Sequence, residues 1–179
     1  MTRRIPPLSN RPNLGHLGLP TGCAQSHSGH MHPSALPLVW SQDVQVAMES
    51  TCLAAYPGEG CGFLLGSDAD GQRSLTVVRE VDNRAGEDQL RRFQMTPLDF
   101  VQAERAAATL GLEVLGIYHS HPDHRAIPST HDLVGAWPHL SYVILAVDGS
   151  TTKPQVVETR SWQLDDPARF SEESLRILH

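Results

Sequence analysis

The chain of 179 residues lacks the features that usually mark membrane and secreted proteins. No apolar run is long enough to span a bilayer. Arg3 and Arg4 are not followed by the apolar segment that a secretory signal requires. Positive charge is also scarce: the formal net charge is -6 at pH 7 and the pI is about 5.9, which argues against a surface for nucleic acid or anionic lipid. We therefore expect no nucleic-acid partner and no membrane partner.

Cysteine is scarce too. The chain has three cysteines, Cys23, Cys52 and Cys61, and none stands in CxxC spacing. An odd number without paired spacing argues against a disulfide framework and against a zinc site built from cysteines. We expect a protein of the reducing cytoplasm, with Cys52 as a buried core thiol.

The first 34 residues differ in composition from the rest. Residues 1–34 are rich in Pro, Gly, Ser, Asn and His and show no periodic apolar pattern, which is typical of disordered segments. His27, His30 and His32 could bind a metal weakly, but a disordered tail is the simpler interpretation. We predict a disordered N-terminal tail over residues 1–34 and one domain over residues 35–179, which is long enough for a single core.

Two helices are predicted from capping residues and apolar periodicity. Ser41 can cap a helix over Gln42–Ala55, and Thr96 can cap a second that runs to about Leu110 and ends at Gly111. In the second, Pro97 stands at the first helical position and Asp99 at the third. Three- and four-residue steps predict the inner faces, which are Val44, Ala47, Met48, Cys52 and Ala55 in the first helix and Phe100, Ala103, Ala107 and Leu110 in the second.

Runs of apolar and alternating residues predict the strands. A strand is favoured over a short helix at the C-terminal end, and a third, short helix is expected from Ser129. These elements predict an α/β (α+β) domain in which helices pack on a mixed sheet. The expected strands are Leu36–Trp40, the apolar centre of the run Glu59–Gly66, Arg73–Val81, a short one over Arg92–Met95, Glu113–Tyr118, Ser141–Val147, Gln155–Leu164 and Phe170–Leu178.

The stretch from His119 to Asp132 carries the strongest chemical signal. His119 and His121 follow an apolar strand, so alternation points both side chains to the same face. If the turn that starts at Ser129 folds back, Asp132 comes beside them. Two imidazole nitrogens and one carboxylate leave one position of a tetrahedral zinc open, as in a catalytic site. The alternative is that Ser129-x-x-Asp132 is only the capping box of an ordinary helix.

A second candidate lies at the start of the run Glu59-Gly-Cys-Gly-Phe-Leu-Leu-Gly66. Glycines on either side of its apolar centre suggest a central strand that other backbone approaches closely. Glu59 stands at the mouth of that strand. A solvated turn carboxylate is one interpretation, since Pro57 and Gly58 mark a turn. With a metal set elsewhere in the chain, Glu59 becomes the natural general base.

Together these residues resemble the signature of the JAMM (MPN-plus) metallopeptidases, and of their small stand-alone bacterial and archaeal members in particular. The signature is a Glu before a glycine-rich strand, then His-x-His, seven residues and Ser-x-x-Asp. The resemblance covers about residues 36–178. It implies the MPN/JAMM (cytidine deaminase-like) fold and one Zn²⁺ per chain, held by His119, His121 and Asp132. Glu59 would activate the zinc-bound water, and Ser129 would hydrogen-bond the developing oxyanion.

The same resemblance implies a substrate class. Relatives of this type hydrolyse the peptide or isopeptide bond after the C-terminal Gly-Gly of a ubiquitin-like or sulfur-carrier protein, and the polar segment 82–95 would help to hold that tail. No cysteine/histidine insertion follows the motif, so selectivity for one ubiquitin linkage is not expected. A homodimer stays open, as do two alternative functions: a non-catalytic MPN scaffold, and a zinc hydrolase of a small amide.

Overall fold

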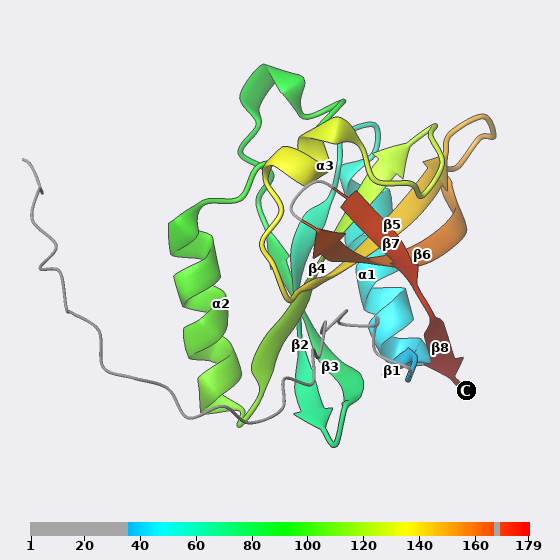
Figure 1. Ribbon diagram of the computed structural model, residues 1–179. Coiled ribbons are helices and arrows are strands. Elements are labelled where there is room, and N and C mark those ends of the chain that lie inside the picture. The colour runs from blue at the N-terminus through cyan, green and yellow to red at the C-terminus, as the bar shows by residue number, and fades with distance from the viewer. Residues whose placement is uncertain (1–35, 167–168) are drawn as a thin grey trace, which may run out of the picture. The chain divides into compact units, whose positions relative to one another are not determined.

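The computed structural model describes residues 36–166 and 169–179, which form an eight-stranded mixed sheet with helices on both faces (Figure 1). The strand order is β7-β6-β5-β4-β2-β3-β1-β8. The predicted tail over residues 1–34 lies outside the described residues. No helix in the described ranges is long and apolar enough to cross a membrane. The elements are β1 (Leu38–Ser41), α1 (Gln42–Ala55), β2 (Cys61–Ala69), β3 (Gln72–Val81), the short 3₁₀ helix η1 (Gly86–Asp88), α2 (Pro97–Thr109), β4 (Glu113–Pro122), α3 (Thr130–Val134), β5 (Ser141–Asp148), β6 (Gln155–Asp166), β7 (Arg169–Glu173) and β8 (Leu175–Leu178).

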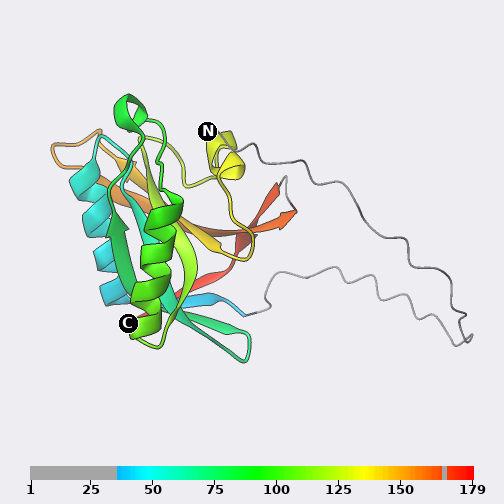
Figure 2. The same ribbon diagram turned by 90° about the vertical axis from the view of Figure 1, so that its left-hand side faces the viewer.

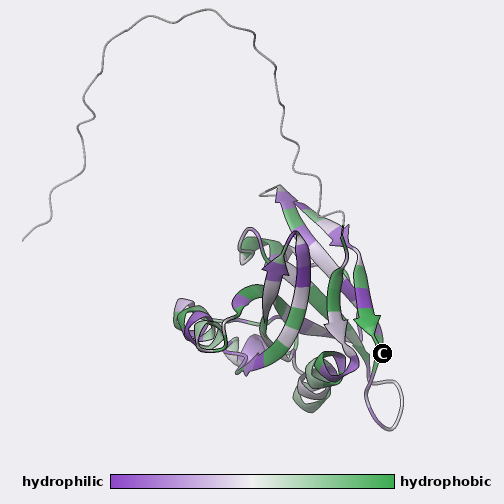
Figure 3. Ribbon diagram, turned by 90° about the horizontal axis from the view of Figure 1, so that it is seen from below, coloured by the Kyte–Doolittle hydropathy of each residue, from purple (hydrophilic) through white to green (hydrophobic). Residues whose placement is uncertain are grey.

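The two faces of the sheet bury separate apolar clusters, because side chains alternate along each strand. On one face α1 packs Val44, Met48 and Cys52 against Leu64 and Tyr118. On the other face α2 packs Ala103 and Ala107 on a cluster that also holds strand residues. Figure 2 shows the sheet between α1 on one side and α2 on the other. Seen end on in Figure 3, both long helices carry hydrophobic and hydrophilic residues, as helices with one face on a sheet should.

The end of the chain joins the two edges of the sheet. β7 pairs with β6 at one edge, while β8 pairs with β1 at the other. Only Ser174 separates the two strands, and its carbonyl accepts a hydrogen bond from the Leu38 N–H at 2.8 Å. The buried Arg73 of β3 reaches Glu173 of β7 at 3.3 Å. The strand prediction for Phe170–Leu178 is therefore confirmed, although the segment divides between opposite edges.

Three local predictions are wrong. Ala47 is exposed, and Gln45 is buried in its place because its amide accepts from Trp40 Nε1 at 2.9 Å and donates to Thr159 Oγ1 at 3.1 Å. Leu110 is 58% exposed, because α2 ends one residue earlier and Leu110 is its C-cap. The segment Arg92–Met95 forms no strand. It belongs to the loop before α2, in which Gln94 is hydrogen-bonded to the chain at residues 83–84.

Candidate active site

Strand β4 brings His119 and His121 to the face of the sheet that α2 and α3 cover. β4 lies between β2 and β5, and its register pairs His119 with Cys61 of β2 and with Ile144 of β5. Both histidines are buried, with their Nε2 atoms 3.1 Å apart. Two nitrogens this close, on one rigid strand, can bind the same ion.

Helix α3 adds a carboxylate to this pair. Ser129 is its N-cap, and Asp132 stands three residues on, in a complete capping box. The Asp132 Oδ2 atom accepts the Ser129 N–H at 2.5 Å, while its Oδ1 atom lies 3.3 Å from His119 Nε2. One ligand atom from each of His119, His121 and Asp132 lies within 4.8 Å of the others. The capping box and the cluster thus use the same carboxylate.

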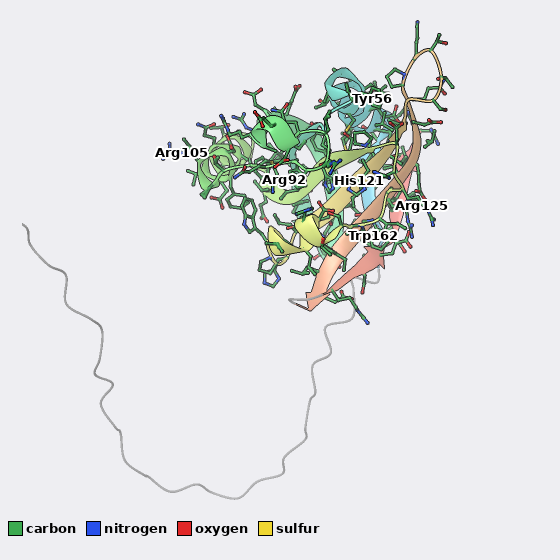
Figure 4. All side chains as sticks on the ribbon, turned by 90° about the horizontal axis from the view of Figure 1, so that it is seen from above. Tyr56, Arg92, Arg105, His121, Arg125 and Trp162 are labelled. Carbon is green, nitrogen blue, oxygen red and sulfur yellow. The ribbon has the colours of Figure 1, made fainter. Side chains whose placement is uncertain are left out.

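The two imidazole rings are oriented differently. The Nδ1 atom of His121 is 2.9 Å from the Arg125 carbonyl, so it donates its proton there and turns Nε2 toward the cluster. The Nδ1 atom of His119 is buried and makes no hydrogen bond within the described part of the chain. The ring of Phe93 stacks on His119, with centroids 4.4 Å apart. Figure 4 looks onto this end of the sheet and shows His121 between Arg92 and Arg125.

Electrostatics favour an ionised carboxylate in the cluster. Burial opposes ionisation of Asp132, but His119, His121 and the Ser129 N–H outweigh it and lower the pKa of Asp132 below its ordinary value. Burial lowers the pKa of His119. Burial acts in the same direction on His121, but hydrogen bonds to Asp132 and to the Arg125 carbonyl leave its pKa raised. Two nitrogens and one carboxylate oxygen in a buried site form a donor set that fits Zn²⁺ with one position open.

Glu59 lies next to this cluster, just before β2. Gly60 donates its N–H to Ser120 Oγ at 2.9 Å, and its carbonyl accepts the Ser120 N–H at 2.9 Å. Continuing the register that pairs Cys61 with His119 puts Glu59 opposite His121. Glu59 is only 6% exposed, so the interpretation as a solvated turn carboxylate does not hold. Burial raises its pKa to about 7; His121 opposes that rise and Asp132 adds to it.

The glycine after Glu59 allows helix α1 to lie directly against the mouth of the strand. A Cβ atom on Gly60 would come 2.9 Å from the Thr51 carbonyl oxygen and 3.0 Å from Cys52 Cα, both of them backbone atoms of α1. A side chain at this position would push the start of β2 away from α1. The glycine predicted to permit a close backbone approach therefore helps to set the position of Glu59.

Ser129 combines a capping role with an available proton. Its Oγ atom accepts the Asp132 N–H at 3.2 Å, and Ser129 is exposed at the rim of the site. Accepting this bond leaves the hydroxyl proton for another acceptor. Both interpretations of Ser129-x-x-Asp132 are thus compatible in one structure, because a helix cap can also orient a metal ligand.

A narrow pocket of about 130 Å³ opens beside Asp132. One wall comes from the loop before α2, with Phe93 and Met95, and the other from α3 and the loop after it, with Trp137. Sequence analysis pointed to the segment 82–95 but missed Trp137, because an isolated aromatic residue after a short helix carries no motif. The lining residues are Arg92, Phe93, Gln94, Met95, Ile117, His131, Asp132, Gly135, Trp137 and Tyr142. We call this pocket the groove.

The described cysteines offer no nucleophile to this site. Cys52 and Cys61 are free and buried, which confirms the prediction for Cys52. Burial raises the pKa of each thiol to about 12, so both stay protonated near neutral pH. The chemistry of the site therefore rests on the histidines and carboxylates.

Comparisons with known proteins identify the family of the chain. Residues 41–165 match the family described as prokaryotic homologs of the JAB domain. The chain is 36% identical over 97 residues to the desampylase of Haloferax volcanii, which covers 54% of this chain and 68% of that protein. It is 33% identical over 116 residues to the desampylase of Pyrococcus furiosus, and the match covers 64% of this chain and 72% of that protein. It is 34% identical over 97 residues to a probable TtuB-protein conjugate cleaving protease of Thermus thermophilus, and the match covers 54% of this chain and 62% of that protein.

Solved structures show the same fold. A protein from Desulfitobacterium hafniense matches with a TM-score of 0.66 at 25% identity, covering 79% of this chain and 92% of that one. A protein from Salinibacter ruber matches with a TM-score of 0.59 at 36% identity, covering 77% of this chain and 90% of that one. The predicted α/β fold is therefore confirmed. The family match spans more than half of the chain, and the chain belongs to the prokaryotic JAB-domain family as a small hydrolytic member of the JAMM isopeptidase type.

Proposed function

We propose that this protein is a zinc-dependent metallopeptidase that cleaves the peptide or isopeptide bond after the C-terminal Gly-Gly of a ubiquitin-like or sulfur-carrier protein. One observation carries the proposal: the buried cluster of His119, His121 and Asp132 lies beside the buried Glu59 and at the end of the groove. The peptidase domain is proposed to be residues 35–179, with residues 1–34 as a tail.

Each side chain has a distinct role in this proposal. A zinc ion held by His119, His121 and Asp132 would polarise a water molecule and the scissile carbonyl. Glu59 takes a proton from the attacking water and passes it to the leaving amine, and a pKa near 7 suits a group that does both. The Ser129 hydroxyl donates to the carbonyl oxygen as negative charge develops there.

The groove favours a tail without side chains. Phe93, from the loop before α2, and Trp137, from the loop after α3, both line it. On the loop side, Gln94 binds the chain at residues 83–84. The main-chain groups of Phe93 and Met95 have no hydrogen-bond partner among the described residues. An extended Gly-Gly segment can pair with these groups and still fit the narrow passage.

The names of the relatives support the substrate class. Two are desampylases and one is a probable protease of TtuB-protein conjugates. A non-catalytic scaffold would have no use for a complete ligand set with an adjacent buried carboxylate. The alternative, a zinc hydrolase of a small amide, predicts that no Gly-Gly fusion is cleaved.

The test compares wild type with Glu59→Gln, purified without added metal. Bound zinc is measured by atomic emission, and each protein is then offered a ubiquitin-like protein extended by a peptide beyond its Gly-Gly. We expect about one zinc per chain in both proteins, but cleavage only by wild type. Glu104→Gln, which changes an exposed carboxylate on α2, is the matched control and should cleave like wild type.

The possible failures are distinct. Zinc without cleavage of any Gly-Gly fusion would overturn the substrate class and leave the metal site standing. Wild type that neither retains zinc nor becomes active when zinc is restored would overturn the enzymatic proposal. Full activity in Glu59→Gln would remove Glu59 from the mechanism.

A further inference from the structure

One loop contacts both halves of the proposed active site. It runs from Asn83, just after β3, to Gln94, just before α2, and we call it the groove loop. Its C-terminal part lines the groove through Arg92, Phe93 and Gln94. The same loop binds the main chain of Glu59 and stacks on the ring of His119.

Asn83 is the centre of the hydrogen bonds in this loop. Its Nδ2 atom donates to the carbonyls of Glu59 at 2.9 Å and Arg92 at 3.1 Å. Its Oδ1 atom accepts the N–H groups of Ala85 at 3.0 Å and Gln94 at 3.1 Å. A carboxamide has two donor protons and two acceptor lone pairs, so every hydrogen-bonding position of the Asn83 side chain is used.

These bonds fix the backbone at Glu59 from the loop side. The Glu59 carbonyl accepts from Asn83, and the Glu59 N–H donates to the Gln89 carbonyl at 2.9 Å. From the other side, Gly60 is bonded to Ser120 of β4. The Glu59 Oε2 atom has no hydrogen-bond partner among the described residues. The position of this carboxylate is therefore set through its backbone, and the groove loop supplies half of that support.

The loop also supports His119. His121 is oriented by its bond to the Arg125 carbonyl, but His119 has no such bond at Nδ1 in the described chain. The other nitrogen of a metal-binding histidine is usually held by a hydrogen bond, which fixes the ring. Phe93 covers the His119 ring at 4.4 Å with an interplanar angle of 28°. Stacking on the groove loop takes the place of the missing hydrogen bond.

We propose that Asn83 and Phe93 are positioning residues of this active site. Asn83 sets the place of Glu59, and Phe93 sets the orientation of His119. The loop is itself anchored, because the neighbouring Arg84 makes a two-point contact with the buried Asp99 of α2, at 3.3 Å for each bond. A tail bound in the groove would press on the loop that orders the catalytic groups. This proposal rests on the proposed function and adds two residues to it.

The substitution Asn83→Asp tests whether Asn83 positions Glu59, because it should leave the fold of the groove loop in place. The carboxylate keeps the two acceptor bonds from Ala85 and Gln94 but loses the donors to Glu59 and Arg92. We expect unchanged zinc content and a fall in kcat of about 10- to 100-fold, the scale of a displacement near 1 Å. Gln102→Glu is the matched control, because it makes the same amide-to-carboxylate change at an exposed position on α2. If Asn83 only shaped the groove, KM would rise and kcat would stay.

Phe93→Ala tests the second contact on substrate-free protein. We expect zinc to transfer to a competing chelator more readily, with an affinity about tenfold lower, as for other partners of metal-binding histidines. Phe93→Tyr keeps an aromatic ring and should restore wild-type affinity. Arg91→Ala, an exposed change on the same loop, should have no effect.

The two residues should fail in different ways. Asn83→Asp is expected to lose turnover and keep zinc, whereas Phe93→Ala is expected to lose zinc affinity. If wild type binds zinc and cleaves its substrate but both variants match it in kcat and zinc affinity, the positioning proposal is wrong while the proposed function stands. If wild type itself shows neither property, the proposed function has failed.

Discussion

Helices α2 and α3 begin with the same local structure and use it for different ends. In α2, Thr96 accepts the Asp99 N–H at 3.2 Å, and Asp99 Oδ2 accepts the Thr96 N–H at 2.8 Å. In α3, Ser129 and Asp132 form the same two bonds, at 3.2 and 2.5 Å. Both aspartates are buried. At the level of the motif the two helix starts are equivalent.

The difference lies in the group that faces the second carboxylate oxygen. Asp99 Oδ1 is 3.3 Å from Arg84 Nη2, so its charge is neutralised by a permanent cation. Asp132 Oδ1 is 3.3 Å from His119 Nε2, next to His121. A guanidinium fills its site, whereas two imidazoles can turn their lone pairs to a metal ion. A capping box therefore orients a carboxylate, and the facing strand or loop decides what that carboxylate does.

The largest expected difference comes from replacing each aspartate by asparagine. Asp132→Asn should lose most bound zinc and all measurable cleavage, because a neutral amide is a poor substitute for a carboxylate ligand. Asp99→Asn should keep one zinc per chain and cleave its substrate, with a loss of stability of about 1 kcal/mol from the weakened cap. Zinc content, cleavage and urea unfolding of both variants provide the check. Zinc loss in Asp99→Asn would erase the distinction between the two helices.

Removing the cap hydroxyls should give a smaller contrast. Ser129→Ala is expected to lower kcat by about 100-fold, the scale of one lost oxyanion donor. Thr96→Ala should leave kcat unchanged, and each variant should lose about 1 kcal/mol of stability as a helix loses its cap. Steady-state kinetics and unfolding curves measure the two effects. Ser129→Thr keeps a hydroxyl and serves as the control; equal kcat for Ser129→Ala and wild type would leave Ser129 with capping alone.

Sequence reasoning worked where one element carries the information. The alternation of β4 places His119 and His121 on one face, and spacing from Ser129 places Asp132 in the first turn of α3. The structure brings these three side chains together, and their role as zinc ligands remains a prediction. Local periodicity and capping depend on neighbouring residues, so they can be recognised without the rest of the fold.

Features made by distant segments escaped prediction. Gln45 is buried because Thr159, 114 residues away, offers a partner for its amide. Arg73 of β3 and Glu173 of the edge strand β7 form a buried ion pair, although they are 100 residues apart. In the sequence Asn83 is an ordinary loop residue, and only the structure shows its contact with Glu59. Such polar contacts override hydropathy patterns, because a buried polar group is stable wherever a partner reaches it.

The smallest expected effect is the contribution of the Asp99 charge to the free energy of unfolding in acid. The hydrogen bond from Thr96 lowers the pKa of Asp99 to about 2 from an ordinary value of 3.8; burial opposes this, and Arg84 reinforces it. A depressed native pKa stabilises the fold fully above pH 3.8, and that stabilisation is lost as the pH falls toward 2. Wild type should therefore lose more stability than Asp99→Asn between pH 5 and about pH 2, as urea unfolding at several pH values will measure. Parallel curves for the two proteins would mean that Arg84 and the cap do not hold the Asp99 charge, and the proposed division between a structural and a catalytic capping box would lose its electrostatic basis.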